Sequence, residues 1–402
     1  MKRAFAITMF ATAGTLITTS VHAQTITSIG ALGTTQSSYA YAVNHDGSAA
    51  AGFSTYSGGY YFGVYWTPAG LTNLWTVPGG LRSFAFGMTP DGNTVAGTCI
   101  VSGGAHAFRW TSAGGMQDLG TLPTQTVSYG YAISADGNVV VGGTTAVGFG
   151  NAFRWSSASG MVNLGTLPGE SSAALLAIDA DGSDGTGFSG IGAAHQAILW
   201  DEVSGMQPLG FLPGGGNSEG EAISGDGSVV AGWSESSIGT HAFVWTSAAG
   251  MEDLGVVAGM TDSAAHAISL DGTVIAGSGG GAAFIWTKTM GMTNLATYLS
   301  SHGVNLTGWT LYSCNAIGAD RTALAGEGRF NGQLRGWVVR GLAPITTPCL
   351  ADFNGDSVVD FFDYLDFVDA FSSNLPASDF NADGVIDFFD YLDFVDAFST
   401  GC

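Results

Sequence analysis

The sequence predicts a mainly β protein, in which a seven-bladed β-propeller of about 45-residue repeats is followed by a small α-helical, EF-hand-like module. Two observations support the propeller. Three sequence markers each recur seven times between residues 24 and 341, and each repeat contains four short runs typical of strands. A third observation supports the module, because one pattern of acidic loop and helix occurs twice within residues 349–402.

The N-terminal residues 1–23 are typical of a secretory signal peptide. Lys2 and Arg3 precede an apolar stretch at 4–17, and Val21-His22-Ala23 provides a small-residue cleavage site. No other segment reaches the length of apolar sequence needed for a membrane span. We therefore expect an exported protein without a membrane span, secreted or attached to the cell surface.

The composition excludes several classes of partner. The 402 residues contain 10 Lys and Arg against 32 Asp and Glu, a net charge of −22. Cleavage of the signal would remove Lys2 and Arg3, leaving a net charge of about −24. Nucleic acid and anionic membrane surfaces are repelled by such a charge. The 63 glycines and 46% hydrophobic residues favour short strands joined by tight turns over disorder.

Three markers define the repeat. An apolar-x-x-Asp-Gly turn, with Gly lost in the last copy, has its carboxylates at Asp46, Asp91, Asp136, Asp181, Asp226, Asp271 and Asp320. A strand-like run ends at Trp66, Trp110, Trp155, Trp200, Trp245, Trp286 and Trp337. Leu-Gly-x-Leu-Pro occurs at 119–123, 164–168 and 209–213, with looser versions in the other repeats. We expect each Asp to accept turn amides and each Trp to fill a gap between blades.

The unit at 116–156 illustrates the four strands. They are predicted at 116–119, 129–134, 139–142 and 152–155, with an Asp-Gly hairpin between the second and third. The propeller region, 24–341, begins with a first-strand motif and ends with a fourth-strand motif. Each blade is therefore expected to come from contiguous sequence, with the ring closed between complete blades. A linker at 342–348 would lead to the module.

The repeated acidic loops predict two Ca²⁺ sites. Carboxylate, amide and backbone oxygens at loop positions 1, 3, 5, 7, 9 and 12 suit this ion. The candidate ligands of the first loop are Asp352, Asn354, Asp356, Val358, Asp360 and Asp363. Those of the second are Asp379, Asn381, Asp383, Val385, Asp387 and Asp390. No Lys or Arg occurs in 349–402, so two structural ions would relieve the repulsion within the module.

Each loop is followed by a predicted helix, at 361–372 and 388–399. One apolar face would carry Phe361, Tyr364, Leu365, Val368 and Phe371, and the two such faces are expected to pack together. Four other aromatic side chains are candidates for contact with a partner: Phe362, Phe367, Phe389 and Phe394.

Four cysteines suit an oxidising compartment. Cys349 and Cys402 bracket the module, and a bridge between them would stabilise it by roughly 4 kcal/mol. Cys99 and Cys314 then remain as a second candidate pair. They lie in the second and seventh units, which only the first unit would separate around a closed ring. Sequence leaves this connectivity open.

The repeat resembles the HAF family of extracellular repeats, through strings such as His106-Ala107-Phe108 and its copy at 241–243. The tail resembles a type I dockerin of the variety that ends in Gly-Cys, in this chain Gly401-Cys402. That resemblance implies the same Ca²⁺ ligands and attachment to a protein or cell-envelope partner. Two departures stand out. Loop position 6 is Ser357 in the first copy, and phenylalanines replace the small polar residues of cohesin-binding dockerins at positions 10 and 11.

Residues that break the repeat are the candidates for a propeller site. Three carboxylates fall in the fifth unit, at Glu219, Glu221 and Glu235, and Asp201-Glu202 precedes it. Six tyrosines in the first unit could form an aromatic face for a sugar or protein: Tyr39, Tyr41, Tyr56, Tyr60, Tyr61 and Tyr65. The histidines of the HAF strings, His106 and His241, are interpreted as structural because other repeats replace them.

We interpret the chain as a secreted, non-catalytic binding or structural protein. Its calcium-loaded tail would attach it to a surface partner, and an extracellular glycan or protein is the candidate ligand of the propeller. The alternative is a secreted carbohydrate-active enzyme delivered by its dockerin, with paired carboxylates as acid and base. A third interpretation makes the tail only a stabilising module.

Overall fold

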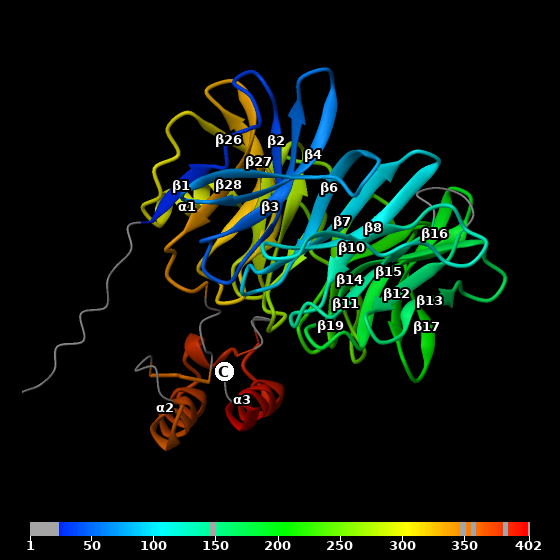
Figure 1. The fold of residues 1–402 in the computed structure, drawn as a ribbon. Helices are drawn as coiled ribbons and strands as arrows, with labels where there is room; N and C mark the ends of the chain where they lie inside the picture. Colours follow the sequence, from blue (N-terminus) through cyan, green and yellow to red (C-terminus); the bar gives the residue numbers. More distant parts are fainter. Residues whose placement is uncertain (1–23, 145–149, 346–350, 355–358, 381–384, 401–402) are drawn as a thin grey trace, which may run out of the picture.

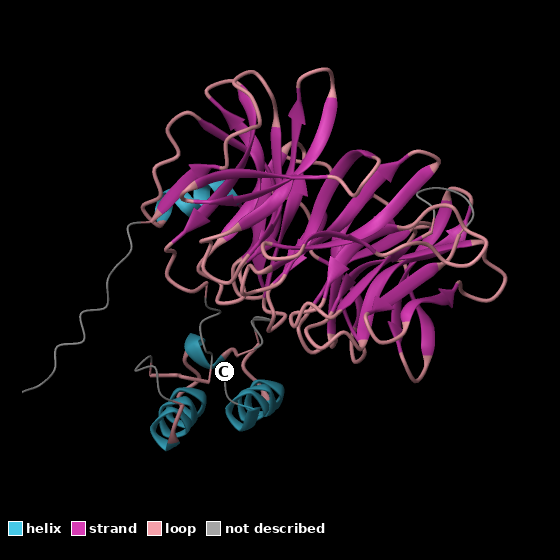
Figure 2. Cartoon of the chain, in the orientation of Figure 1, coloured by secondary structure: helices cyan, strands magenta, loops and turns pink. Residues whose placement is uncertain are grey.

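A computed structural model describes residues 24–144, 150–345, 351–354, 359–380 and 385–400. Seven four-stranded antiparallel sheets follow one another around a ring (Figure 1), so the predicted seven-bladed β-propeller is confirmed. Strands dominate, and helices are few (Figure 2). The predicted signal peptide lies outside the described residues. Among the described residues, no helix is both long and apolar enough to cross a membrane.

Six blades are each built from four consecutive strands, which run in chain order from the innermost to the outermost. The first blade contains β2 (Ser38–Val43), β3 (Ala50–Tyr56), β4 (Tyr60–Thr67) and β5 (Gly70–Trp75). The second contains β6 (Gly80–Met88), β7 (Thr94–Val101), β8 (Gly104–Thr111) and β9 (Gly115–Asp118). The third contains β10 (Tyr129–Ile133), β11 (Val139–Gly143), β12 (Ala152–Ser156) and β13 (Gly160–Gly165). The fourth contains β14 (Ser172–Ile178), β15 (Asp184–Ile191), β16 (Ala194–Asp201) and β17 (Gly205–Gly210). The fifth contains β18 (Ser218–Ile223), β19 (Val229–Ser236), β20 (Gly239–Thr246) and β21 (Gly250–Asp253). The sixth contains β22 (Ala264–Ile268), β23 (Val274–Gly279), β24 (Ala282–Thr287) and β25 (Gly291–Asn294). A short helix, α1 (Leu295–Ser301), leads to the seventh.

The seventh blade closes the ring differently from our expectation. Its strands β26 (Trp309–Ile317), β27 (Leu324–Phe330) and β28 (Gln333–Arg340) are completed by β1 (Thr25–Ser28) from the other end of the propeller. The predicted closure between complete blades is therefore wrong. Each segment that we took for the first strand of a unit is the outermost strand of the preceding blade, because a tight turn folds it back onto its predecessor, as in the pairing of Trp110 with Met116.

The interpretation of the repeated Asp and Trp residues is confirmed. At every one of the seven turns, the Asp Oδ1 accepts the backbone N–H two residues later, at 2.9–3.2 Å. Trp66, Trp155, Trp200 and Trp337 are buried, and the other three pack against the cores between blades. These residues therefore build the scaffold and leave other positions available for a site.

The second disulfide candidate is wrong. Cys99 on β7 and Cys314 on β26 are both free and buried, in blades separated by another blade. Burial raises the pKa of the Cys314 thiol to about 12, although two backbone hydrogen bonds lower it, so this side chain behaves as a small core residue. Cys349 and Cys402 lie outside the described residues.

The tail forms the two predicted helices, α2 (Phe361–Ser372) and α3 (Phe388–Thr400), with a short 3₁₀ turn, η1 (Pro376–Ser378), between them. Their apolar face is rotated from the predicted one, since Phe361 and Leu365 are exposed. The core is formed by Phe367 and Phe394, whose fully buried rings stack with centroids 3.9 Å apart. These two residues are therefore core residues, and their predicted role in partner contact is wrong.

Candidate functional site

One inward-facing position on each innermost strand forms the candidate site. In all seven blades a β-bulge occurs there, and a bulge re-aims a side chain. The bulged residues all line one cavity: Tyr41, Phe86, Tyr131, Leu176, Glu221, His266 and Asn315. Each lies five residues before the Asp of its turn, so the repeat itself places these seven side chains together.

The cavity has a volume of about 530 Å³, within the usual size range of ligand pockets. Two residues further along each inner strand, a ring of aliphatic side chains lines a smaller cavity of about 140 Å³: Val43, Met88, Ile133, Ile178, Ile223, Ile268 and Ile317. Backbone hydrogen bonds between neighbouring turns, such as His45 N–H to the Pro90 carbonyl at 2.9 Å, tie the blades together at that end. The larger cavity is therefore framed by a rigid scaffold.

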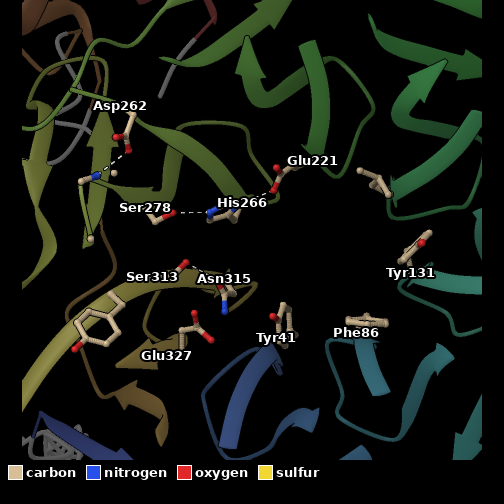
Figure 3. Close-up of a pocket in the computed structure, with 15 residues that line it drawn as sticks. Tyr41, Phe86, Tyr131, Glu221, Asp262, His266, Ser278, Ser313, Asn315 and Glu327 are labelled. Carbon is tan, nitrogen blue, oxygen red and sulfur yellow. Dashed lines mark hydrogen bonds and ion pairs between the residues drawn. The ribbon is translucent and has the colours of Figure 1, made fainter. Parts of the chain in front are cut away.

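Aromatic rings from the first three blades form one wall of the cavity (Figure 3). The rings of Tyr41 and Phe86 meet edge to face at 5.5 Å, and Phe86 lies 5.9 Å from Tyr131. Burial, together with nearby Tyr129 and Glu219, raises the pKa of Tyr131 to about 12. Its hydroxyl therefore stays protonated and can donate a hydrogen bond to a ligand.

Polar side chains form the opposite wall (Figure 3). His266 Nδ1 lies 2.5 Å from Glu221 Oε2, and His266 Nε2 lies 2.8 Å from the Ser278 hydroxyl. Both His266 and Glu221 keep about a quarter of the side chain accessible, at 25% and 23%. These three residues come from β22, β18 and β23, so the contact between His266 and Glu221 joins two blades.

The pKa values of two polar groups that line the cavity, His266 and Glu327, reflect burial and neighbouring charges. Burial lowers the pKa of His266, but Glu221, Glu327 and Glu219 outweigh it, so the net shift is upward. Burial raises the pKa of Glu327, which nearby His266 partly offsets. Glu327 Oε2 is buried and finds no hydrogen-bond partner among the described residues, which agrees with the raised pKa because burial disfavours the charged carboxylate.

The three carboxylates expected in the fifth blade do not form one group. Glu221 contacts His266, whereas Glu219 lies 3.4 Å from His195 Nε2 and Glu235 accepts the Asn217 amide at 3.1 Å. Asp201 accepts turn amides. Glu202 lies 3.5 Å from Arg154. Only Glu221 of this set lines the cavity, and each of the others has a partner that explains it structurally.

Sequence reasoning missed His266, Ser278 and Glu327. His266 was recoverable, because it occupies the repeat position of Glu221 one unit later. Of the six tyrosines of the first unit, Tyr41 lines the cavity. Tyr39 and Tyr61 stack on Phe53 and Phe84, and Tyr65 packs on Trp110. Most of the predicted aromatic face is therefore packing within and between blades.

The histidines of the HAF strings have a structural role. His106 Nδ1 lies 2.8 Å from Asp118 Oδ2, and His241 Nδ1 lies 2.9 Å from Asp253 Oδ2, across adjacent strands. Each Asp also accepts the N–H two residues later. Neither histidine lines the cavity.

In the tail, the loops that would hold Ca²⁺ are described in part. Asp356, Val358, Asn381 and Asp383 lie outside the described residues, and no three His, Cys, Asp or Glu side chains among the described ones form a metal cluster. The residues present fit the ion. Asp363 is fully buried, its two oxygens accept the N–H groups of Asn354 and Asp360 at 3.0 and 2.9 Å, and no basic residue occurs in the module. A buried carboxylate in such an acidic loop favours a cation.

Exposed phenylalanines begin both tail helices. Phe362 and Phe389 are each 65% exposed, and their neighbours Phe361 and Phe388 are each 64% exposed. The two helices thus present matching pairs of aromatic side chains, unlike the buried Phe367 and Phe394.

No known family profile matches this chain, and no curated protein matches it. Solved structures are similar in fold at 12% identity. An oligogalacturonate lyase in complex with manganese has a TM-score of 0.52 over 79% of this chain and 93% of its own. An oligogalacturonate lyase from Vibrio parahaemolyticus has a TM-score of 0.53 over 78% and 93%. TolB from Acinetobacter baumannii has 0.41 over 77% and 64%.

At this identity the likeness shows the fold alone. It nevertheless corrects our expectation of a non-catalytic propeller, because these oligogalacturonate lyases are enzymes of similar fold and the fold therefore gives no reason to exclude catalysis. That expectation rested on the lack of a catalytic set in the sequence. The polar wall of the cavity, assembled from β22 and β23 of one blade and β18 of the neighbouring blade, brings together carboxylate, imidazole and hydroxyl groups that the sequence did not show as a set. The chain is thus similar in fold to propeller enzymes.

Proposed function

We propose that this is an exported, carbohydrate-active protein whose propeller cavity takes a neutral sugar unit. One observation carries the proposal: an aromatic wall faces a wall of carboxylate, imidazole and hydroxyl groups across one cavity of about 530 Å³. Aromatic rings pack against the apolar faces of sugar rings, and polar groups opposite can accept and donate hydrogen bonds to their hydroxyls. The signal peptide predicted from the sequence supports export.

The charge of the cavity favours a neutral ligand. Glu221, Glu327 and Asp262 line it, and His266 is the single basic side chain among its lining residues. Acidic sugars would be repelled by these carboxylates. The net charge of the chain, −22, acts in the same direction.

Tyr131→Ala is expected to weaken carbohydrate binding about tenfold, because it removes a ring from the aromatic wall. Isothermal titration calorimetry on the whole protein, with a panel of neutral and acidic oligosaccharides, measures this. Tyr60→Ala is the control, since Tyr60 is 46% exposed and lies outside the cavity. Preferred binding of acidic sugars, or equal affinity of Tyr131→Ala and the unaltered protein, would argue against the proposal.

The tail would attach the protein to a protein or cell-envelope partner. Two Ca²⁺ ions, held by the loop oxygens, would order it and neutralise its charge. The exposed phenylalanines at the start of α2 and α3 are the surface we assign to this attachment. The acidic, loop-and-helix duplication of 349–402 is the feature that supports this part of the proposal.

Calcium is expected to bind at two sites, and Asp363→Asn to abolish one of them, because it removes a charge from a buried ligand position. Calorimetric titration of the metal-free protein with CaCl₂ counts the sites. Asp366→Asn is the matched control: it removes the same charge from an exposed position of α2 outside the loop. Unchanged stoichiometry in Asp363→Asn, or no Ca²⁺ binding at all, would rule out these sites.

A further inference from the structure

The polar wall of the cavity contains a hydrogen-bonded chain of three residues. Ser278 Oγ lies 2.8 Å from His266 Nε2, and the other ring nitrogen of His266 lies 2.5 Å from Glu221 Oε2. In the tautomer that satisfies both contacts, Nδ1–H donates to the carboxylate and Nε2 accepts the serine O–H. This is the connectivity by which a hydroxyl is activated as a nucleophile.

We infer that Ser278 is the nucleophile of an acyl-transfer site, with His266 as its general base and Glu221 as the group that orients the imidazole. The substrate class is an ester carried by a neutral carbohydrate, such as an acetylated oligosaccharide. The substrate part of this inference rests on the proposed carbohydrate site and names the reaction performed there.

The surroundings of Ser278 leave room for an acyl group. Gly279, Gly280 and Gly281 follow it and line the same cavity, so no side chain stands beside the hydroxyl on that stretch. A Cβ at Gly279 would lie 2.3 Å from the Asp262 carbonyl oxygen, and Gly280 has a φ of 57°, so the local backbone favours glycine at both positions. Ser278 is partly accessible, as a nucleophile must be.

Other histidine–carboxylate pairs of the described chain differ from this one. His106 and His241 contact Asp118 and Asp253, but neither lines the cavity. His195 lies near Glu219 and packs against Phe188 and Trp233. Among the residues that the structure describes, only the pair of His266 and Glu221 lies in the cavity with a serine on the second ring nitrogen, which is the combination that acyl transfer needs.

The reaction balances without a further reactant except water. Ser278 Oγ bonds to the ester carbonyl carbon while its proton passes to His266 Nε2. The ester C–O bond then breaks, and the leaving sugar oxygen takes that proton and departs as an alcohol. Water attacks the acyl-serine and gives a proton to Nε2; the bond from carbon to Oγ breaks, Oγ regains the proton, and a carboxylic acid leaves.

The carboxylates around His266 set its pH dependence. Glu221 contacts the ring, Glu219 on β18 and Glu327 on β27 act on it through their charge, and all three favour the imidazolium, the charged form reached during attack. The base must be neutral to accept the proton, and the neighbouring carboxylates raise its pKa above the ordinary value of a histidine. Reaction of Ser278 should therefore rise with pH, with a midpoint above that of an ordinary histidine.

The test uses the whole protein and a biotinylated fluorophosphonate, which bonds covalently to activated serines. We expect labelling at Ser278, located by peptide mass spectrometry, and release of acetate from acetylated neutral oligosaccharides. Ser278→Ala should abolish labelling and lower acetate release by about 10³-fold or more. His106→Asn should change neither, because His106 lies outside the cavity.

The outcomes separate the two proposals. Ser278→Ala removes one oxygen, so its thermal melt should match that of the unaltered protein. Sugar binding without labelling of Ser278 would make the three residues a brace between blades and overturn this inference alone. Labelling of Ser278 without sugar binding would support its role as nucleophile and refute the carbohydrate site. A pH-independent rate of labelling would refute the role of His266 as base.

Discussion

Replacing Trp337 with alanine is expected to lower the free energy of unfolding of the propeller by about 3–5 kcal/mol. Trp337 lies on β28 opposite Gly326 on β27 and Ser28 on β1, at the blade that closes the ring, and it is fully buried. Removing the indole leaves a cavity next to the pairing that joins the two ends of the propeller. Urea unfolding followed by circular dichroism measures the change.

Two variants serve as controls for this prediction. Trp337 Nε1 is buried and has no hydrogen-bond partner among the described residues, so Trp337→Phe keeps most of the apolar contact and removes an unsatisfied donor. It should cost less than about 1.5 kcal/mol. Trp75→Ala, at a side chain 57% exposed, should change stability by less than about 0.5 kcal/mol. Equal stability of Trp337→Ala and Trp75→Ala would contradict the role of Trp337 in stabilising the blade that closes the ring.

Phe367→Ala is expected to unfold the tail while the propeller stays folded. Phe367 stacks on Phe394 at 3.9 Å and receives the edge of Phe353 at 5.4 Å, in the core of a module with two short helices. Loss of such a side chain costs about 3–5 kcal/mol, which is comparable to the whole stability of a domain this small. Because the described part of the propeller contributes one short helix, α1, the helical circular dichroism signal reports mainly on the tail.

The exposed phenylalanines supply the contrast. Phe362→Ser combined with Phe389→Ser should leave the helical signal unchanged, because both side chains are 65% exposed. The same double variant should lose retention at the cell surface, measured by fractionation against the unaltered protein. If it stays attached while Phe367→Ala is released, the attachment surface lies elsewhere on the folded tail. If Phe367→Ala also stays attached, the tail has no part in attachment.

Repeat spacing determined most of the architecture. Turn carboxylates and core tryptophans recur because every blade solves the same packing problem, so seven copies could be counted along the chain and all proved structural. The spacing alone could not show at which strand of the repeat each blade begins. Residues 115–118 read equally well as the first strand of one unit or the last of the preceding one, and only the pairing of Met116 with Trp110 decides.

The two short helices illustrate a different limit. Their positions followed from the 12-residue duplication, but the buried face did not. Asp363, a charged residue, is buried because it accepts backbone N–H groups from Asn354 and Asp360, and this turns Phe361 and Leu365 outward. The pattern of apolar residues alone places the Asp363 carboxylate in solvent. The wrong prediction of the buried helix face therefore comes from a local hydrogen-bond network that hydropathy does not describe.

By itself, the sequence determined a seven-bladed propeller, an acidic duplicated tail and the scaffold roles of the repeated residues, because these depend on periodicity and local turn chemistry. Only the tertiary structure decided that β1 completes the last blade, that Cys99 and Cys314 stay apart, and that Ser278, His266 and Glu221 meet. Circular closure places residues from distant repeats around one axis, and the bulge on each inner strand aims their side chains into the cavity there.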